Sequence, residues 1–181
     1  NMDYDLVVIG SGPGGYVSAI RAAQLGMNVA CIEKNSSLGG TCLNVGCIPS
    51  KALLFSTEKY ADYKYHSKDH GINFDKITID ISKLMERKNK IVKQLTSGIS
   101  FLYKKNKITH IKGEASFIDN KTILIKSEKE LKITSKNFII ATGSKSIDIP
   151  NIIIDEKKVI SATGALSLNH IPKSMLVIGG G

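Results

Sequence analysis

Tyr4-Asp-Leu-Val-Val-Ile9, followed by Gly10-Ser-Gly-Pro-Gly-Gly15, is the stretch that decides the fold of this 181-residue chain. A short apolar run bounded by glycine is typical of a buried parallel strand. Tyr16 to Leu25 is alanine-rich and predicts a helix, and Asn28 to Ile32 predicts a second buried strand that ends at Glu33. Strand, glycine turn, helix and strand within about thirty residues make a βαβ unit, whose crossover we expect to be right-handed.

The glycine turn of this unit has the spacing of a dinucleotide-binding loop. Gly10, Gly12 and Gly15 let the backbone turn tightly and approach a pyrophosphate without an intervening side chain. The helix that follows directs free amides and the positive end of its dipole towards the phosphates. Glu33 stands about twenty residues further on, where a carboxylate accepts a hydrogen bond from a ribose. The sequence therefore predicts dinucleotide binding rather than a purely structural turn.

A second motif carries two cysteines: Gly39-Gly-Thr-Cys42-Leu-Asn-Val-Gly-Cys47-Ile-Pro-Ser-Lys51. If the residues between Cys42 and Cys47 form about one helical turn, the two sulfurs can meet in a disulfide. So short a loop would stabilise the fold little, but it suits a bond that opens and closes. Lys51, one turn beyond Cys47, can supply positive charge to a thiolate. The alternative is two unpaired loop cysteines, and the third cysteine, Cys31, is expected to be a buried strand residue.

The composition excludes several classes of protein. Three cysteines are an odd number without metal-site spacing, which argues against a secreted disulfide scaffold and against a metal site. The chain has no apolar stretch of about eighteen residues and no signal peptide, so we expect a soluble intracellular protein without a membrane partner. The net charge of +9 is concentrated between Lys51 and Lys112. These lysines lack interleaved aromatics, which favours a solvated helix surface over a nucleic-acid site.

The rest of the chain gives a coarser pattern. Lys34 to Cys47 reads as a loop, Pro49 suits the start of a helix, and a long helix is predicted from near Asp80. We expect that long helix to lie across a sheet rather than to form a coiled coil. The remaining expected elements are strands at Ile108 to Lys112, Asn137 to Ala141 and Ser174 to Ile178, a helix at Thr163 to Leu168, and a small antiparallel meander of Ala115 to Ile118, Thr122 to Ile125 and Leu131 to Thr134 with a turn at Asp119-Asn120.

The cysteine segment, extended to Leu54, resembles the redox-active segment of the flavoprotein disulfide reductases, and in particular of the dihydrolipoamide dehydrogenases. The glycine loop with Glu33, Ala141-Thr-Gly143, Ser161 to Ser167 and Pro172 to Gly181 fit the same family. The resemblance implies an α/β fold: a Rossmann-like FAD-binding domain over residues 1–146, with a three-layer parallel sheet and a small antiparallel meander. Residues 147–181 would be a connection and the first strand of a second Rossmann-like domain, for NAD, at which the chain is truncated.

The resemblance also implies a role for individual residues. Cys42 would be the interchange thiol that attacks the substrate disulfide, Cys47 would face the flavin, and Lys51 would approach the redox-active ring nitrogen. These three would be the catalytic residues of this chain. The implied cofactor-binding residues are Gly10, Gly12, Gly15, Glu33, Lys34, Gly40, Thr41, Cys42, Cys47, Lys51, Gly113, Ala115, Ala141, Thr142, Gly143 and Ser144.

The implied activity is the oxidation of protein-bound dihydrolipoyl groups with FAD as cofactor and NAD⁺ as acceptor. The implied partners are the lipoyl domains of a 2-oxo acid dehydrogenase complex and a second copy of the full-length enzyme, in the bacterial cytoplasm or the mitochondrial matrix. A glutathione- or mercuric-reductase-like enzyme and a non-catalytic FAD-binding module are the alternatives.

The family's catalytic histidine lies in a C-terminal interface domain supplied by the other subunit. His66, His70, His110 and His170 do not match its context and are expected to be surface or structural residues. The 181 residues alone are therefore predicted not to complete turnover.

Overall fold

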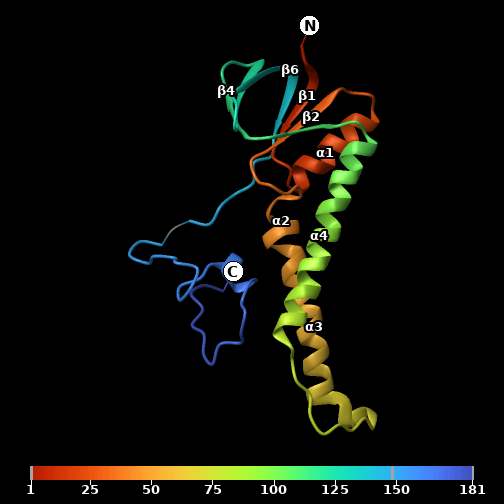
Figure 1. Cartoon of the computed structure of the whole chain (residues 1–181), viewed down its shortest axis with the longest axis vertical. Helices are drawn as coiled ribbons and strands as arrows, with labels where there is room; N and C mark the ends of the chain where they lie inside the picture. Colours follow the sequence, from red (N-terminus) through yellow and green to blue (C-terminus); the bar gives the residue numbers. More distant parts are fainter. Residues whose placement is uncertain (1, 148, 181) are drawn as a thin grey trace.

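The computed structural model describes residues 2–147 and 149–180 and contains a six-stranded sheet in the order β3-β2-β1-β6-β5-β4 (Figure 1). The strands are β1 (Tyr4–Ile9), β2 (Val29–Glu33), β3 (Thr109–Lys112), β4 (Glu114–Phe117), β5 (Thr122–Lys126) and β6 (Leu131–Ile140). The helices are α1 (Pro13–Gln24), α2 (Gly40–Val45), α3 (Cys47–His66), α4 (Ile81–Lys105) and α5 (Ala162–Ala165), with a 3-10 turn η1 (Ser67–His70). The predicted α/β fold with a mostly parallel sheet is confirmed.

Strand β1 lies in the middle of the sheet, and both of its faces are buried. It runs parallel to β2 on one side and to β6 on the other. Leu6 and Val8 pack into a core shared with α1 and α4, whereas Val7 and Ile9 pack into a second core with the isoleucines of β5 and β6. Helices, parallel strands and the antiparallel meander thus form three layers. Burial on both faces explains why β1 is apolar without alternation.

Strand β6 is a single strand where the sequence predicted two. The prediction of separate strands at Leu131 to Thr134 and Asn137 to Ala141 is therefore wrong. One continuous strand pairs antiparallel with β5 from Leu131 to Thr134 and then parallel with β1 from Ser135 to Ile140. The polar residue Ser135 interrupts the apolar pattern between them, but its hydroxyl is satisfied by the carbonyl of Asn137 at 2.8 Å. The predicted turn between β4 and β5 is confirmed, because Asp119 accepts a hydrogen bond from the amide of Lys121 at 2.7 Å.

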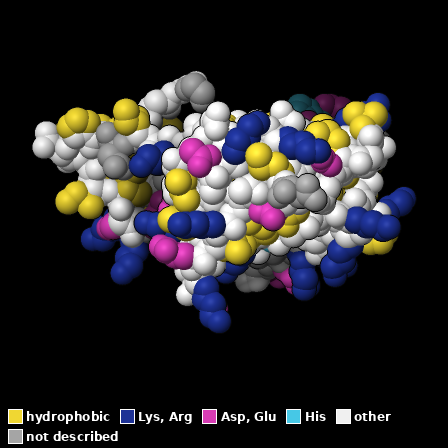
Figure 2. Space-filling model, turned by 90° about the horizontal axis from the view of Figure 1, so that it is seen from above, with side chains coloured by type: hydrophobic (Ala, Val, Ile, Leu, Met, Phe, Trp, Pro, Cys, Tyr) yellow, Lys and Arg dark blue, Asp and Glu magenta, His cyan; other side chains and the backbone are white. Residues whose placement is uncertain are grey.

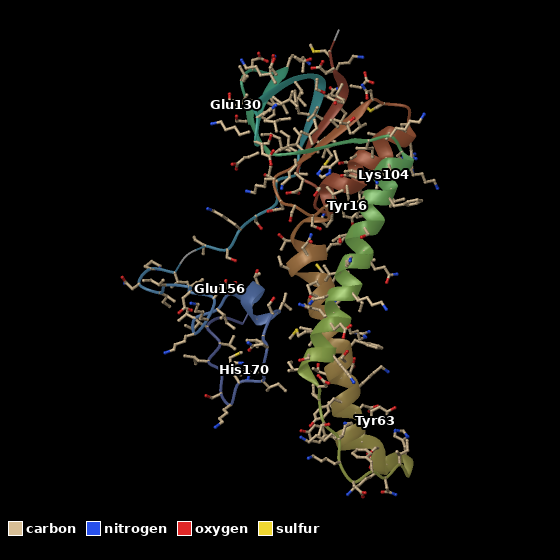
Figure 3. The ribbon with its side chains drawn as sticks, in the orientation of Figure 1. Tyr16, Tyr63, Lys104, Glu130, Glu156 and His170 are labelled. Carbon is tan, nitrogen blue, oxygen red and sulfur yellow. The ribbon has the colours of Figure 1, made fainter. Side chains whose placement is uncertain are left out.

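Helices α3 and α4 lie side by side and project away from the sheet as a long hairpin (Figure 1), with Tyr63 near its far end (Figure 3). Arg87 of α4 joins the two helices by donating to the carbonyl of Ala52 at 3.1 Å. The predicted long helix is confirmed, and Asp80 caps it by accepting from the amide of Lys83. Only its C-terminal turns, with Ile99 and Tyr103, pack on the sheet. The prediction that this helix lies across the sheet is therefore confirmed only for its C-terminal turns, because the rest of α4 packs against α3.

Helix α2 corrects the prediction of an unbroken loop from Lys34 to Cys47. The glycine-rich composition concealed a short helix that begins at Gly40. The side-chain amide of Asn44 stabilises its start by donating to the carbonyls of Leu38 at 3.1 Å and of Gly40 at 2.9 Å. Helix α3 then begins at Cys47 rather than at Pro49. The two cysteines therefore lie on consecutive helices, not in a loop.

The segment after β6 is irregular, and Glu156 and His170 lie within it, away from the sheet region around Glu130 (Figure 3). It contacts α4 where the ammonium of Lys88 donates to the carbonyl of Leu166 at 2.8 Å. Helix α5 starts one residue before the predicted Thr163 and ends at Ala165. The predicted strand Ser174 to Ile178 is wrong for this structure, because no strand of the described ranges lies beside it to complete its backbone hydrogen bonds. The last residue of the predicted second glycine turn, Gly181, lies outside the described residues.

The basic residues do not gather into one patch on the face seen in Figure 2, where Lys and Arg side chains are spread around the outline with acidic side chains between them. Within residues 2–147 and 149–180, no helix combines the length and the apolarity needed to cross a membrane.

Candidate functional site

A cavity of about 690 Å³ lies at the carboxyl ends of β1, β2 and β6. Open α/β sheets bind nucleotides at this edge, and the volume falls within the roughly 300–1,000 Å³ of small-molecule sites. The loop before α1, the end of β2, the start of β4, both cysteine-bearing helices and the residues after β6 form its walls. Segments distant in the sequence therefore meet at one cavity.

Most of the residues predicted for the site line this cavity. They are Gly10, Gly12, Glu33, Lys34, Gly40, Thr41, Cys42, Cys47, Gly113, Ala115, Ala141, Thr142, Gly143 and Ser144.

Two predicted site residues do not line it. Gly15 is buried beneath the loop, where an added Cβ would lie 1.9 Å from the carbonyl oxygen of Gly10, so its role is close packing. Lys51 is exposed on α3, one turn beyond Cys47.

The amino end of α1 faces the cavity with its positive charge uncompensated. Gly12 is the N-cap and provides no side chain, Pro13 occupies the first turn, and no acidic residue lies there. The dipole of a twelve-residue helix and the free amide of Gly14 are therefore available to an anion. A pyrophosphate is the anion that the loop spacing predicted.

The residues after β6 are brought to the cavity by the backbone of the sheet. The amide of Ala141 donates to the carbonyl of Ile9 at 2.8 Å, which continues the pairing of β6 with β1 to the cavity edge. The chain from Ala141 to Ser144 then forms part of the wall. This places the predicted Ala-Thr-Gly loop directly beside the glycine loop, where a Cβ on Gly10 would lie 2.2 Å from the carbonyl oxygen of Ala141.

Glu33 lies at one end of the cavity with its carboxylate fully engaged. Its Oε2 accepts from the amide of Ser11 at 3.0 Å and from the Ser11 hydroxyl at 2.6 Å. Its Oε1 accepts from the amide and from the side-chain amide of Asn35, each at 2.9 Å. Burial raises the pKa of Glu33, but these hydrogen bonds to the charged form outweigh burial, and the pKa lies below its ordinary value. The carboxylate is therefore held ionised.

The cysteine motif is joined directly to the glycine loop. Gly12 and Gly40 pack backbone to backbone: a Cβ on Gly40, whose φ is +62°, would lie 2.5 Å from the Cα of Gly12. The amide of Gly39 also donates to the carbonyl of Ser11 at 3.0 Å. Glycine is required at position 40 for this approach, which holds the start of α2 against the loop. The position of Cys42 is thus coupled to the loop before α1.

The two cysteines of the motif are close together and differ in environment. Both are free thiols here; Cys42 is half-buried on α2, and Cys47 is exposed in the first turn of the 20-residue helix α3. Hydrogen bonding to the Cys47 side chain, followed by burial, raises the pKa of Cys42, while the charge of Lys51 lowers it by less.

Cys31 contrasts with this pair. It is fully buried in β2, and burial raises the pKa of its thiol to about 11. It is an inert strand residue, as the sequence predicted.

Sequence reasoning missed several wall residues, of which Ser11, Asn35 and Glu114 carry polar side chains. Ser11 occupies a variable position of the glycine motif, and Asn35 follows Glu33 by two residues, so a search for donors near the predicted carboxylate would have found both. Glu114 extends towards Lys34 at 3.9 Å across the cavity mouth. None of the four histidines is among the described residues that line the cavity.

The cavity walls fit a dinucleotide that carries a redox-active ring. One end offers an ionised carboxylate for a ribose, the middle offers a side-chain-free loop at a helix amino end, and the other end presents two neighbouring thiols. Two thiols on consecutive helices beside one cavity can form and break a disulfide with little backbone movement. Reversible dithiol–disulfide exchange beside a bound dinucleotide is the chemistry that this arrangement supports.

Comparison with known proteins gives consistent matches. A family model described as pyridine nucleotide-disulphide oxidoreductase matches residues 4–181. Over its whole length the chain is 53% identical to the mitochondrial dihydrolipoyl dehydrogenase of Schizosaccharomyces pombe, and over 98% of its length it is 52% identical to the dihydrolipoyl dehydrogenase of Trypanosoma brucei brucei. It covers 36% and 38% of these relatives, and so spans little more than a third of their length.

A solved structure shares the fold. It is that of the HOCl-induced flavoprotein disulfide reductase RclA from Escherichia coli, a Cu(II) complex, with a TM-score of 0.76 and 30% identity. The match covers 91% of this chain and 34% of that one. Most of the fold of this chain is therefore shared with a flavoprotein.

Proposed function

The chain belongs to the pyridine nucleotide-disulphide oxidoreductase family, and from that premise we propose that its cavity binds FAD and that Cys42 and Cys47 form a redox disulfide beside it. The observation that carries the proposal is a single cavity that joins the Glu33 carboxylate, the loop before α1 and both thiols. We further propose that residues 1–146 form the FAD-binding domain and that residues 147–181 lead into an NAD-binding domain.

The two thiols would have different tasks. Cys42, on the shorter helix, would act as the interchange thiol: a substrate thiolate would attack its sulfur in the Cys42–Cys47 disulfide, forming a mixed disulfide and releasing Cys47 as the leaving thiolate. Cys47, exposed at the start of α3 and on the cavity wall, would be the thiol that faces the flavin. Lys51 would add positive charge to the same region, since its charge acts on the Cys42 thiol. When bound, FAD would accept the electron pair from the dithiol and pass it to NAD⁺.

We propose dihydrolipoyl groups as the electron donor, carried on lipoyl domains of a 2-oxo acid dehydrogenase complex. Relatives named dihydrolipoyl dehydrogenase are about half identical to this chain, whereas the solved disulfide reductase is 30% identical. That difference favours the lipoamide reaction over a glutathione- or mercuric-reductase-like one. A non-catalytic FAD-binding module is disfavoured because binding alone does not require paired thiols.

The setting of the whole protein is part of the same proposal. We expect a homodimer, located in the mitochondrial matrix of a eukaryote, as the name of the yeast relative indicates for that protein, or in the cytoplasm of a bacterium. Because the chain spans little more than a third of its relatives, we expect the 181 residues alone to give no steady-state lipoamide–NAD⁺ turnover. Measured turnover by the purified 181-residue chain would contradict this.

Two measurements test the proposal. The absorption spectrum of the purified protein should show a flavin band, which would establish the cofactor. The whole protein should then reduce NAD⁺ with dihydrolipoamide much faster than it reduces oxidised glutathione or mercuric ion. A protein that binds flavin but prefers glutathione would move the assignment to another disulfide reductase.

A further inference from the structure

The Glu33 carboxylate has an unusually complete set of partners for a group that is expected to bind a ligand. Four donors reach it at 2.6–3.0 Å, two from Ser11 and two from Asn35. An ionised carboxylate has about four lone-pair sites, so the protein already fills them all. A ribose hydroxyl can bind to Glu33 only if one of these donors gives way.

The four donors are not equally free to leave. Two are backbone amides, one held in the loop before α1 and the other following β2. The hydroxyl of Ser11 belongs to a side chain with 0% exposure, and its bond to Glu33 is the shortest of the four at 2.6 Å. The side-chain amide of Asn35 belongs to an exposed residue at the cavity edge and can rotate into solvent. Of the four, the Asn35 amide is the donor that a ligand can replace at least cost.

We propose that Ser11 is a permanent positioning residue for Glu33 and that the side-chain amide of Asn35 is a stand-in that a ribose hydroxyl of the bound dinucleotide replaces. This inference rests on the proposed FAD binding. While the ligand is absent, Asn35 satisfies Oε1 and keeps the carboxylate in the plane set by Ser11. When the ligand binds, the hydroxyl takes over that lone pair, and Ser11 retains Oε2.

The charge state of Glu33 links the two residues. Hydrogen bonds from Ser11 and Asn35 to the charged form keep its pKa below the ordinary value despite burial. Removing either side-chain donor should raise that pKa in the ligand-free protein. The two variants should nevertheless differ in FAD affinity, because only Ser11 remains bonded to the carboxylate in the complex.

The test combines two readouts on S11A, N35A and the matched control S36A, which removes an exposed hydroxyl next to Asn35. First, ¹³C NMR titration of the Glu33 carboxyl in the FAD-free protein, assigned with E33Q, should show a raised pKa for S11A and N35A and no change for S36A. Secondly, flavin fluorescence titration at neutral pH should show about tenfold weaker FAD binding for S11A, because a hydrogen bond to a charged group is lost. N35A should bind FAD as tightly as the unchanged protein or tighter.

The pH dependence separates positioning from simple damage to the fold. For both variants the acid limb of FAD affinity should move to higher pH, since a carboxylate with a raised pKa is protonated earlier as the pH falls. An equal loss of affinity at every pH, an unmoved Glu33 pKa, or an N35A variant as weak as S11A would each overturn the inference while leaving FAD binding in place. Failure of the unchanged protein to bind FAD would instead overturn the proposed function, and the ribose assignment with it.

Discussion

The two ends of the cavity are built in opposite ways. At the Glu33 end, Glu33 is 6% exposed and Ser11 is fully buried, and every acceptor site of the carboxylate is occupied. At the cysteine end, Cys42 is half-buried, Cys47 is exposed, and both are free thiols. One end is therefore formed before a ligand arrives, as suits recognition. The other remains open to a reacting partner, as suits exchange chemistry.

The two ends nevertheless share one backbone junction. Gly12 packs on Gly40, and the carbonyl of Ser11 accepts from the amide of Gly39. Ser11 thus contacts Glu33 through its amide and side chain and contacts the cysteine motif through its carbonyl. This junction therefore connects the recognition end directly to the start of α2.

The largest effect is expected at the reactive end. Cys47→Ser should lower turnover of the whole protein by about a thousandfold or more, because the redox disulfide can no longer form. It should also abolish the long-wavelength charge-transfer absorbance of the reduced enzyme, if Cys47 is the flavin-facing thiolate. Cys42→Ser is the matched control: turnover should fall similarly, but the absorbance should remain. Loss of the absorbance in the Cys42 variant alone would reverse the two assignments.

The junction should be the next most sensitive position. Gly40→Ala places a Cβ 2.5 Å from the Cα of Gly12 at a φ of +62°, so the free energy of unfolding should fall by about 2 kcal/mol or more. Gly71→Ala is the control, because Gly71 has a similar φ of +72° but a Cβ added there would meet no atom within 4 Å. This variant should lower the free energy of unfolding by about 1 kcal/mol or less. Urea unfolding measures both. Equal losses in the two variants would show that backbone strain alone, and not the contact, matters at Gly40.

The glycine loop and Glu33 could be predicted from the sequence because their signal is local: a strand, a loop and a carboxylate at fixed spacing. Strand β6 could not, because its pairing with both β5 and β1 depends on segments far away in the chain. Helix α2 was hidden by glycines that serve a tertiary contact rather than a turn. The two partners of Glu33 differ in this respect: Ser11 reaches Glu33 only when the loop before α1 and the end of β2 are brought together, whereas Asn35 lies two residues after Glu33 and carries a local signal.

A smaller effect is expected on thiol reactivity. Because the pKa of Cys42 is raised, its thiolate fraction at neutral pH is below that of an ordinary thiol, and alkylation should be slow. Lys51→Gln removes a charge that lowers this pKa, so the pKa should rise further and the rate at pH 8 should fall by about two- to threefold. Mass spectrometry of iodoacetamide-treated protein reports each cysteine separately.

A second lysine variant and a buried cysteine serve as controls for the alkylation rate of Cys42. Lys59→Gln makes the same charge change on α3, two turns beyond Lys51, and should leave the Cys42 rate unaltered. Cys31 should stay unmodified in the folded protein because it is fully buried. An unchanged Cys42 rate in the Lys51 variant would show that this lysine does not act on the pair.

The smallest effect is expected at the rim of the recognition end. Lys34 and Glu114 approach to 3.9 Å, but their side chains are 65% and 73% exposed, so a double-mutant cycle should give a coupling of about 0.5 kcal/mol or less that vanishes in high salt. The buried bonds to Glu33 should matter more, because Ser11→Ala leaves a buried carboxylate short of a donor. If the rim pair were the stronger of the two, solvent-exposed charge would hold the recognition end in place. The Glu33 end could then no longer be described as held in place by buried hydrogen bonds.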